Sequence, residues 1–328
     1  MPATQSRVND FVLKIGTVNG TGSASANGLL LKALFRMGVP VTGKNLFPSN
    51  IQGLPTWYEI RANKDGYMSR TGRVDVMVAM NAQTYEKDMN EVSAGGFLIY
   101  DSTWPRRDVL AREDITVLGV PLAKLCNENF EVARLRILMK NVAYVGVLAA
   151  LLELDVDVIR NLLQETFANK KKLVDSNLKA IMLGYDYAKE HFSCPLPVHA
   201  EVMGDNSHNI MITGNEAAGL GCLYAGATVG AWYPITPSTS LMDAFGKYCE
   251  QFRTDPETGD KRFAIIQAED ELAAAGIVLG ANWAGARAFT PTSGPGISLM
   301  SEFIGFAYYA EIPSVFIDVQ RVGPSTGM

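Results

Sequence analysis

Cysteine is scarce in this chain of 328 residues. Its four cysteines stand at positions 126, 194, 222 and 249, far apart and without any Cys-x-x-Cys spacing. Zinc sites and iron–sulfur clusters need closely spaced thiols, so we expect neither of them in this chain. Isolated thiols are typical of a reducing compartment, and we therefore expect a cytoplasmic protein.

Long apolar runs and an excess of basic charge are also missing. The longest apolar runs, such as residues 145–152, fall well short of the ~20 residues needed to span a bilayer. The N-terminus has no apolar signal-peptide core. The formal net charge of −5 provides no basic surface for nucleic acid. We therefore expect neither a membrane nor a nucleic-acid partner.

The pattern of apolar residues predicts an α/β protein with two domains. Length and a hydrophobic content of 48% are enough for two cores. Strand-like runs alternate with polar or helical stretches in the first half, which predicts a parallel sheet, and the chain from 128 to about 191 is largely helical. The predicted strands are 11–18, 74–79, 97–100 and 115–120, and the predicted first helix is 24–37.

The second half begins after a stretch rich in proline and glycine. We predict a first α/β domain over residues 1–193, a linker over 194–208 and a second parallel-sheet domain over 209–328. Its predicted strands are 229–235, 263–267 and 314–320, and its predicted helices are 214–226, 272–280 and 297–309. In open α/β sheets, ligands bind at the carboxyl ends of strands. Thr236, Glu271 and Arg321 each lie at or just beyond such an end.

A rigid polar loop follows the strand at 229–235. It reads Tyr233-Pro-Ile-Thr-Pro-Ser-Thr-Ser240, and the prolines at 234 and 237 restrict the backbone on both sides of Thr236. Such a loop suits the presentation of a ligand-binding hydroxyl. An ordinary proline-rich turn is the alternative.

A glycine-rich turn near the N-terminus follows a strand and begins a helix. Gly20, Gly22 and Ser23 could offer backbone amides to a phosphate, as in coenzyme A. A dinucleotide site is not favoured, because Ser25 replaces the third glycine of the G-x-G-x-x-G pattern and no acidic residue follows at the expected distance. Tight packing of strand against helix is the other interpretation.

Five segments in the second half resemble, in the same order, motifs of the thiamine-dependent 2-oxoacid:ferredoxin oxidoreductases. They belong to the component of that family that binds the aminopyrimidine half of thiamine diphosphate, and the resemblance implies a doubly wound pyrimidine-binding fold for 209–328. The N-terminal glycine loop resembles the gamma component, which is fused ahead of the alpha component in some members. The five segments are Gly214–Gly219, Tyr233–Pro237, Glu269–Gly276, Thr290–Gly296 and Gln320–Gly327.

The resemblance assigns roles to individual residues. The loop Tyr233-Pro234-Ile235-Thr236 is expected to contact the cofactor, and Glu271, followed five residues later by a glycine, is expected to hydrogen-bond the aminopyrimidine ring. Glu269 takes this role if the register differs by two, and helix capping is the alternative for the acidic cluster. Arg321 is expected to bind the carboxylate of the 2-oxoacid with Thr236 beside it; a surface ion pair is its alternative.

Partners follow from what the chain does not contain. The family binds the diphosphate and Mg²⁺ through a G-D-G motif, and its [4Fe-4S] cluster through spaced cysteines, on a beta subunit; neither pattern occurs in this sequence. The resemblance thus implies a heteromer, as a dimer of heterodimers, that converts 2-oxoglutarate and coenzyme A to succinyl-CoA and carbon dioxide and reduces ferredoxin. Alternatives are pyruvate or a branched-chain 2-oxoacid as substrate, or a non-catalytic assembly or nucleotide-binding subunit. Fused relatives continue further, so the chain is expected to be part of such a subunit.

Overall fold

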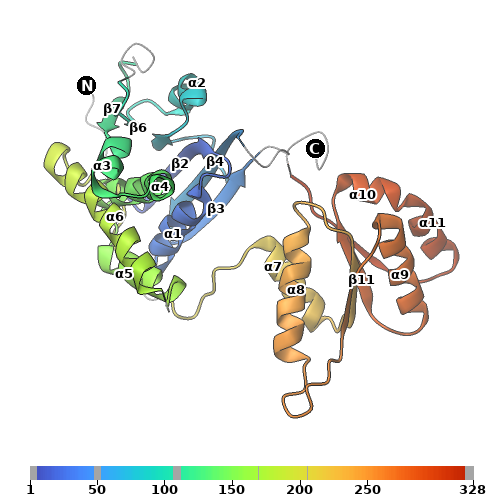
Figure 1. Ribbon diagram of the computed structural model, residues 1–328. Coiled ribbons are helices and arrows are strands. Elements are labelled where there is room, and N and C mark those ends of the chain that lie inside the picture. Colours follow the sequence, from blue (N-terminus) through green and yellow to red (C-terminus); the bar gives the residue numbers. More distant parts are fainter. Residues whose placement is uncertain (1–5, 48–52, 106–111, 169, 205, 322–328) are drawn as a thin grey trace. The chain divides into compact units, whose positions relative to one another are not determined.

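The computed structural model describes residues 6–47, 53–105, 112–168, 170–204 and 206–321. The chain divides into two compact units, 1–211 and 212–328. Both contain a β-sheet with helices on its two faces (Figure 1).

The first unit is built on a six-stranded mixed sheet. Strands β2, β5, β6 and β7 are parallel, whereas β4 runs antiparallel to both β2 and β3. The α/β fold class is therefore confirmed, but β3 and β4 were not predicted, and β4 makes this sheet mixed where a parallel one was expected. In spatial order the strands are β3 (Val41–Leu46), β4 (Pro55–Asn63), β2 (Asp10–Val18), β5 (Val76–Ala79), β6 (Phe97–Asp101) and β7 (Thr116–Val120).

Part of the predicted linker pairs with the first unit in a second, two-stranded sheet. Strand β8 (Val198–His199) pairs in parallel with β1 (Arg7–Val8). The backbone amides of Leu196 and Ala200 also donate to the carbonyls of Leu151 and Leu152 at 2.8 and 2.9 Å. Residues 196–200 thus pack on the first unit.

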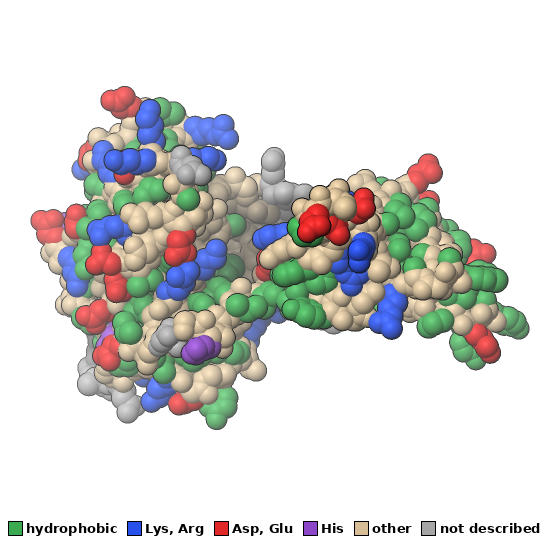
Figure 2. Space-filling model, turned by 90° about the horizontal axis from the view of Figure 1, so that it is seen from below, with side chains coloured by type: hydrophobic (Ala, Val, Ile, Leu, Met, Phe, Trp, Pro, Cys, Tyr) green, Lys and Arg blue, Asp and Glu red, His purple; other side chains and the backbone are tan. Residues whose placement is uncertain are grey.

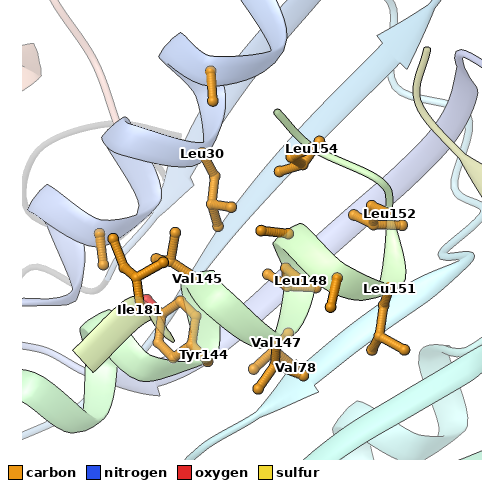
Figure 3. Packing of buried hydrophobic residues seen from close by; sticks show 14 of the residues in the cluster. Leu30, Val78, Tyr144, Val145, Val147, Leu148, Leu151, Leu152, Leu154 and Ile181 are labelled. Carbon is orange, nitrogen blue, oxygen red and sulfur yellow. The ribbon is translucent and has the colours of Figure 1, made fainter. Parts of the chain in front are cut away.

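Helices cover both faces of the six-stranded sheet. Helix α2 packs on one face through the cluster that contains Met77, Tyr85 and Leu98, and the larger core lies on the other face. The helices are α1 (Ser23–Arg36), α2 (Tyr85–Glu91), α3 (Leu122–Asn129), α4 (Ala133–Leu151), α5 (Val156–Thr166) and α6 (Lys171–His191), with a short 3₁₀ helix at Ala82–Thr84. Figure 3 shows the larger core, where Tyr144, Leu148 and Leu151 of α4 meet Leu30 of α1 and Val78 of β5.

Helices α4 and α6 cross at two glycines. A Cβ atom on Gly146 would lie 1.8 Å from the carbonyl oxygen of Ile181, and one on Gly184 would lie 2.0 Å from that of Ala143. Only residues without a side chain allow the two backbones to approach this closely. The second half of α4 is consequently buried on all sides, which explains why its sequence is apolar without helical periodicity.

The second unit has a four-stranded parallel sheet in the order β10 (Ala264–Gln267), β9 (Val229–Trp232), β11 (Ala288–Thr292) and β12 (Val315–Asp318). Helices α7 (Gly214–Tyr224) and α8 (Thr239–Phe252) cover one face, where Phe245 packs edge-on against Phe289 of β11. Helices α9 (Glu271–Trp283), α10 (Gly294–Leu299) and α11 (Ser301–Tyr309) cover the other (Figure 1). The predicted helix 297–309 is two consecutive helices.

The strand order creates a topological switch point. The connection after β9 leads to β10 on one side, and the connection after β11 leads to β12 on the other. A crevice between β9 and β11 at their carboxyl ends is where open α/β sheets bind ligands. Helix α9 joins β10 to β11 and packs on both β9 and β11, so its N-terminus also reaches this crevice.

The surfaces of the two units differ. Acidic and basic side chains are interspersed on the visible face of the first unit, whereas hydrophobic side chains gather on that of the second (Figure 2). Across the part of the chain that the structure describes, no helix is long and apolar enough to cross a membrane. Large exposed apolar residues of the second unit include Tyr224, Trp283, Tyr308 and Tyr309.

Candidate functional site

The candidate site lies at the carboxyl edge of the parallel sheet in the second unit. Trp232 of β9 is level with Gln267 of β10, and Thr292 of β11 is level with Asp318 of β12. The residues that follow each strand therefore emerge at the same edge. Three of the residues predicted from the sequence, Thr236, Glu271 and Arg321, all follow strands that end there.

The loop after β9 is a compact turn that leads into α8. The amides of Ser238 and Thr239 both donate to the carbonyl of Ile235, at 2.9 and 3.1 Å. The Asn215 amide of α7 holds the loop from outside, donating to the carbonyl of Pro237 at 2.8 Å. Thr236 is exposed, and its peptide bond to Pro237 is cis. The loop thus has a fixed backbone and presents the Thr236 hydroxyl at its surface.

The remaining residues of this predicted contact loop differ in exposure. Tyr233 is 37% exposed, Pro234 is exposed and Ile235 is half-buried. The loop therefore offers an aromatic ring, a proline ring and a hydroxyl to whatever binds beside it.

The acidic cluster after β10 separates into three different environments. Asp270 caps α9, because its carboxylate accepts a hydrogen bond from the backbone amide of Ala273 at 2.7 Å. Glu269 is exposed, whereas Glu271 is only 8% exposed in the first turn of α9. Capping thus explains Asp270 and leaves Glu271 as a buried carboxyl group next to the positive end of a helix dipole.

A glycine at position 296 allows helix α10 to approach Glu271 closely. A Cβ atom on Gly296 would lie 1.8 Å from the hydroxyl oxygen of Thr292 and 3.1 Å from Cγ of Glu271. Any side chain at position 296 would therefore fill the space between the hydroxyl and the glutamate. Thr292 is buried, and its hydroxyl has no hydrogen-bond partner among the residues that the structure describes.

Arg321 follows β12 and is half-buried. The backbone amide of Val319, two residues earlier, donates to the carbonyl of Thr292 at 2.9 Å, so this segment continues alongside the end of β11. The predicted loop from Gly323 to Gly327 lies outside the described residues, as does Val322. Arg321 is thus brought to the same edge as Thr236 and Glu271.

The predicted phosphate loop lies in the first unit, after β2. Gly20 and Gly22 have left-handed backbones with φ of 85° and 84°, and α1 begins at Ser23. The Ser23 hydroxyl accepts a hydrogen bond from Thr17 at 2.9 Å, and Asn141 of α4 donates to the carbonyl of Thr21 at 2.8 Å. The turn is therefore packed on its neighbours, and its role in binding phosphate stays a prediction.

No group of three or more metal-ligating side chains occurs within residues 6–321 where the structure describes them. All four cysteines are free thiols. Burial raises the pKa of Cys126 to about 11, and burial also raises that of Cys222.

The sequence matches two protein-family models in consecutive segments. Residues 12–187, more than half of the chain, match the model of pyruvate ferredoxin/flavodoxin oxidoreductase. This chain belongs to that family. Residues 220–328, which include Thr236, Glu271 and Arg321, match the model of the thiamine diphosphate-binding domain of pyruvate flavodoxin/ferredoxin oxidoreductase.

Curated relatives extend the match over both units. An alpha subunit of 2-oxoacid:ferredoxin oxidoreductase 2 from Aeropyrum pernix is 31% identical over 97% of this chain and 56% of its own length. A 2-oxoglutarate synthase subunit KorA from Methanocaldococcus jannaschii is 48% identical, over 35% of this chain and 29% of its own. The chain thus spans about half the length of the relatives that match it throughout.

A solved structure has the same fold. The 2-oxoglutarate:ferredoxin oxidoreductase from Magnetococcus marinus, solved with 2-oxoglutarate, coenzyme A and succinyl-CoA bound, matches 98% of this chain and 54% of its own. The TM-score is 0.82 at 28% identity. The resemblance read from five sequence motifs is therefore confirmed at the level of the family and the fold.

Sequence reasoning did not single out Asn215, Thr292 or Gly296 for the site. All three fall within segments whose resemblance to the family was noted, so that signal was available. Their contacts depend on how α7 and α10 pack against the strand ends, which the sequence alone does not specify.

Proposed function

We propose that this chain is the gamma–alpha part of a 2-oxoglutarate:ferredoxin oxidoreductase. The complete enzyme would convert 2-oxoglutarate and coenzyme A to succinyl-CoA and carbon dioxide, and two electrons would pass singly to ferredoxin. The observation that carries the proposal is the buried Glu271 at the switch point of a domain that matches the thiamine diphosphate-binding family model. The bound ligands of the Magnetococcus marinus structure and the 48% identity to a 2-oxoglutarate synthase subunit support this choice of 2-oxoacid.

The residues present fit the aminopyrimidine half of thiamine diphosphate. When bound, this cofactor supplies the carbon nucleophile and electron sink that decarboxylation of a 2-oxoacid requires. Glu271 would hydrogen-bond a ring nitrogen, and its burial makes such a contact stronger than one exposed to water. The Thr292 hydroxyl beside it has no hydrogen-bond partner among the described residues, so it can still donate or accept a hydrogen bond at this edge of the sheet. The loop Tyr233–Thr236 would contact the ring from the β9 side.

Arg321 and Thr236 would hold the 2-oxoacid. A guanidinium group offers two parallel donors to a carboxylate, a geometry that an ammonium group does not reproduce. The exposed Thr236 hydroxyl would donate to the 2-oxo or carboxylate oxygen. These two residues thus orient the substrate, whereas Glu271 acts on the cofactor.

A partner subunit completes the proposed enzyme. We place the diphosphate, Mg²⁺ and the [4Fe-4S] cluster on a beta subunit, in a dimer of heterodimers, with ferredoxin as the acceptor. The turn at Gly20, Gly22 and Ser23 is our candidate for a phosphate of coenzyme A, because helix α1 begins there after Gly22, which has no side chain to cap the first backbone amides. The four free thiols fit the reducing cytoplasm, where we place the complex.

The test is the reduction of ferredoxin by the complex assembled with its beta subunit. We expect reduction to require 2-oxoglutarate, coenzyme A and thiamine diphosphate together. Glu271→Gln should keep assembly intact and slow turnover by roughly two to four orders of magnitude, as expected for the loss of an acid–base group. Glu269→Gln is the matched control and should stay near wild type, because Glu269 is exposed.

Other outcomes would redirect the assignment. Full activity with pyruvate or a branched-chain 2-oxoacid, and none with 2-oxoglutarate, would keep the chemistry and change the substrate. An assembled complex that reduces no ferredoxin with any 2-oxoacid would indicate an assembly or nucleotide-binding subunit. Loss of activity in Glu269→Gln alone would mean that Glu269, and not Glu271, contacts the aminopyrimidine ring.

A further inference from the structure

Two threonine hydroxyls are buried on strand β11 without a hydrogen-bond partner in the described part of the chain. Thr290 is 0% exposed and Thr292 is 1% exposed, and both hydroxyl oxygens are unpaired. A buried hydroxyl without a partner costs about 1–3 kcal/mol, and a valine would fill the same shape without that cost. Folding therefore does not account for a hydroxyl at either position.

The two hydroxyls share a face of the strand but differ in their distance from the candidate site. Residues 290 and 292 alternate with Phe289, which packs against α8, so both point to the side of α9 and α10. Thr292 is the last residue of β11, and Thr290 lies about 6.5 Å further from the carboxyl edge. Thr290 is thus the chemical match of Thr292 at a position remote from the edge.

The Thr292 hydroxyl faces Glu271 across the missing side chain of Gly296. A Cβ atom on Gly296 would be 1.8 Å from the hydroxyl oxygen and 3.1 Å from Cγ of Glu271, which places those two atoms within about 5 Å of each other. Rotation about the side-chain bonds of Glu271 is enough to close a separation of that size. Glycine at 296 keeps the space between the two groups open.

We propose that Thr292 is a positioning residue, whose hydroxyl donates a hydrogen bond to the Glu271 carboxylate when that carboxylate binds the aminopyrimidine ring. This inference rests on the proposed function. A donor on one carboxylate oxygen fixes the plane of the group, so that the other oxygen points to the ring nitrogen. Hydrogen bonds to charged groups are stronger than those between neutral groups, and burial strengthens them further.

The test measures the binding of thiamine diphosphate with Mg²⁺ to the complex assembled with its beta subunit. Thr292→Val should weaken binding roughly tenfold, the effect of losing one hydrogen bond to a charged group. Thr292→Ser restores the hydroxyl and should bind within about threefold of wild type. Thr290→Val removes an equally buried hydroxyl and should bind like wild type, so a general effect of the substitution on packing is controlled.

A double-mutant cycle shows whether Thr292 acts through Glu271. In a Glu271→Ala background, Thr292→Val should weaken binding by less than about twofold, because the acceptor is gone. A purely structural threonine would weaken binding by the same factor in both backgrounds.

The outcomes separate this inference from the proposed function. If Glu271→Ala and Thr292→Val both leave binding unchanged, the proposed cofactor site is wrong. If Glu271→Ala weakens binding and Thr292→Val does not, only the positioning role is overturned. If Thr292→Val weakens binding equally with and without Glu271, the hydroxyl acts on the ligand itself and the inference is wrong.

Discussion

Substitution of Gly146 by alanine tests the closest contact in the first unit. In an ordinary helix this change is stabilising by about 1 kcal/mol, because alanine is the better helix former. In α4 the added Cβ would lie 1.8 Å from the carbonyl oxygen and 2.7 Å from the carbonyl carbon of Ile181. Both atoms belong to the backbone of α6, so no side-chain rotation relieves the overlap.

The magnitude follows from how far α6 must move. Ordinary contact begins at about 3.4 Å, so one helix must shift by about 1.6 Å in a close-packed core. Overpacking costs typically 1–3 kcal/mol, and such a shift also separates the apolar side chains that α4 and α6 share. We expect a net loss of roughly 2–4 kcal/mol, or a fall in Tm of roughly 5–15 °C for a unit of this size.

The assay is differential scanning calorimetry of the whole chain, with Gly28→Ala as the matched control. Gly28 lies in helix α1, and a Cβ atom there would meet nothing within 4 Å. Alanine at position 28 should therefore raise the Tm of the same transition by a few degrees at most. An unchanged or raised Tm in Gly146→Ala would refute the close crossing of α4 and α6.

Three further predictions concern other positions. Gly296→Ala should keep the fold but lower affinity for thiamine diphosphate in the assembled complex, because the new Cβ displaces Thr292; unaltered affinity would contradict the geometry of α10. Arg321→Lys should raise the KM for the 2-oxoacid with little change for coenzyme A, and unchanged 2-oxoacid kinetics would place carboxylate binding elsewhere. Asp88 accepts a hydrogen bond from Trp57, and burial raises the pKa of its carboxyl group. The stability that this carboxyl group contributes is therefore present at low pH and is lost as the pH rises through its raised pKa. The free energy of unfolding of wild type should thus fall relative to Asp88→Asn from about pH 4 upward in urea titrations, and parallel profiles would show that Asp88 titrates normally.

Strands β9, β10 and β12 of the second unit were predictable because their apolar runs are short and bounded by turn residues, whereas β11 was not predicted. Strand β4 was missed for a physical reason. Its Glu59 and Arg61 are buried, and each is paired, with Arg70 at 2.7 Å and with Asp10 at 2.7 Å. Buried charges interrupt the apolar pattern from which a strand is predicted. The oppositely charged partners that make their burial possible come close only when the chain has folded.

The helical segment of the first unit illustrates the opposite case. The sequence predicted helix from 128 to about 191, and α4, α5 and α6 occupy most of it. The close crossing at Gly146 and Gly184 was not predicted, because a glycine within a helix signals only a local loss of propensity. The backbone against which each of these glycines packs belongs to the other helix, so the contact is seen only in the structure.

The candidate site was predictable in part. Thr236, Glu271 and Arg321 follow predicted strands, and the rule that ligands bind at the carboxyl ends of parallel strands placed them at one edge. The place of Thr292 beside Glu271 was not predictable, because it depends on α9 returning across β9 to β11 and on the close approach of α10. Local sequence carries no information on that crossing.

A structure of the chain assembled with its beta subunit and thiamine diphosphate tests the central proposal most directly. We expect a carboxylate oxygen of Glu271 within hydrogen-bonding distance, about 2.6–3.2 Å, of a nitrogen of the aminopyrimidine ring, with the loop Tyr233–Thr236 against the same ring. An aminopyrimidine ring held by Glu269, or bound away from the carboxyl edge of β9 and β11, would contradict the assignment of this site.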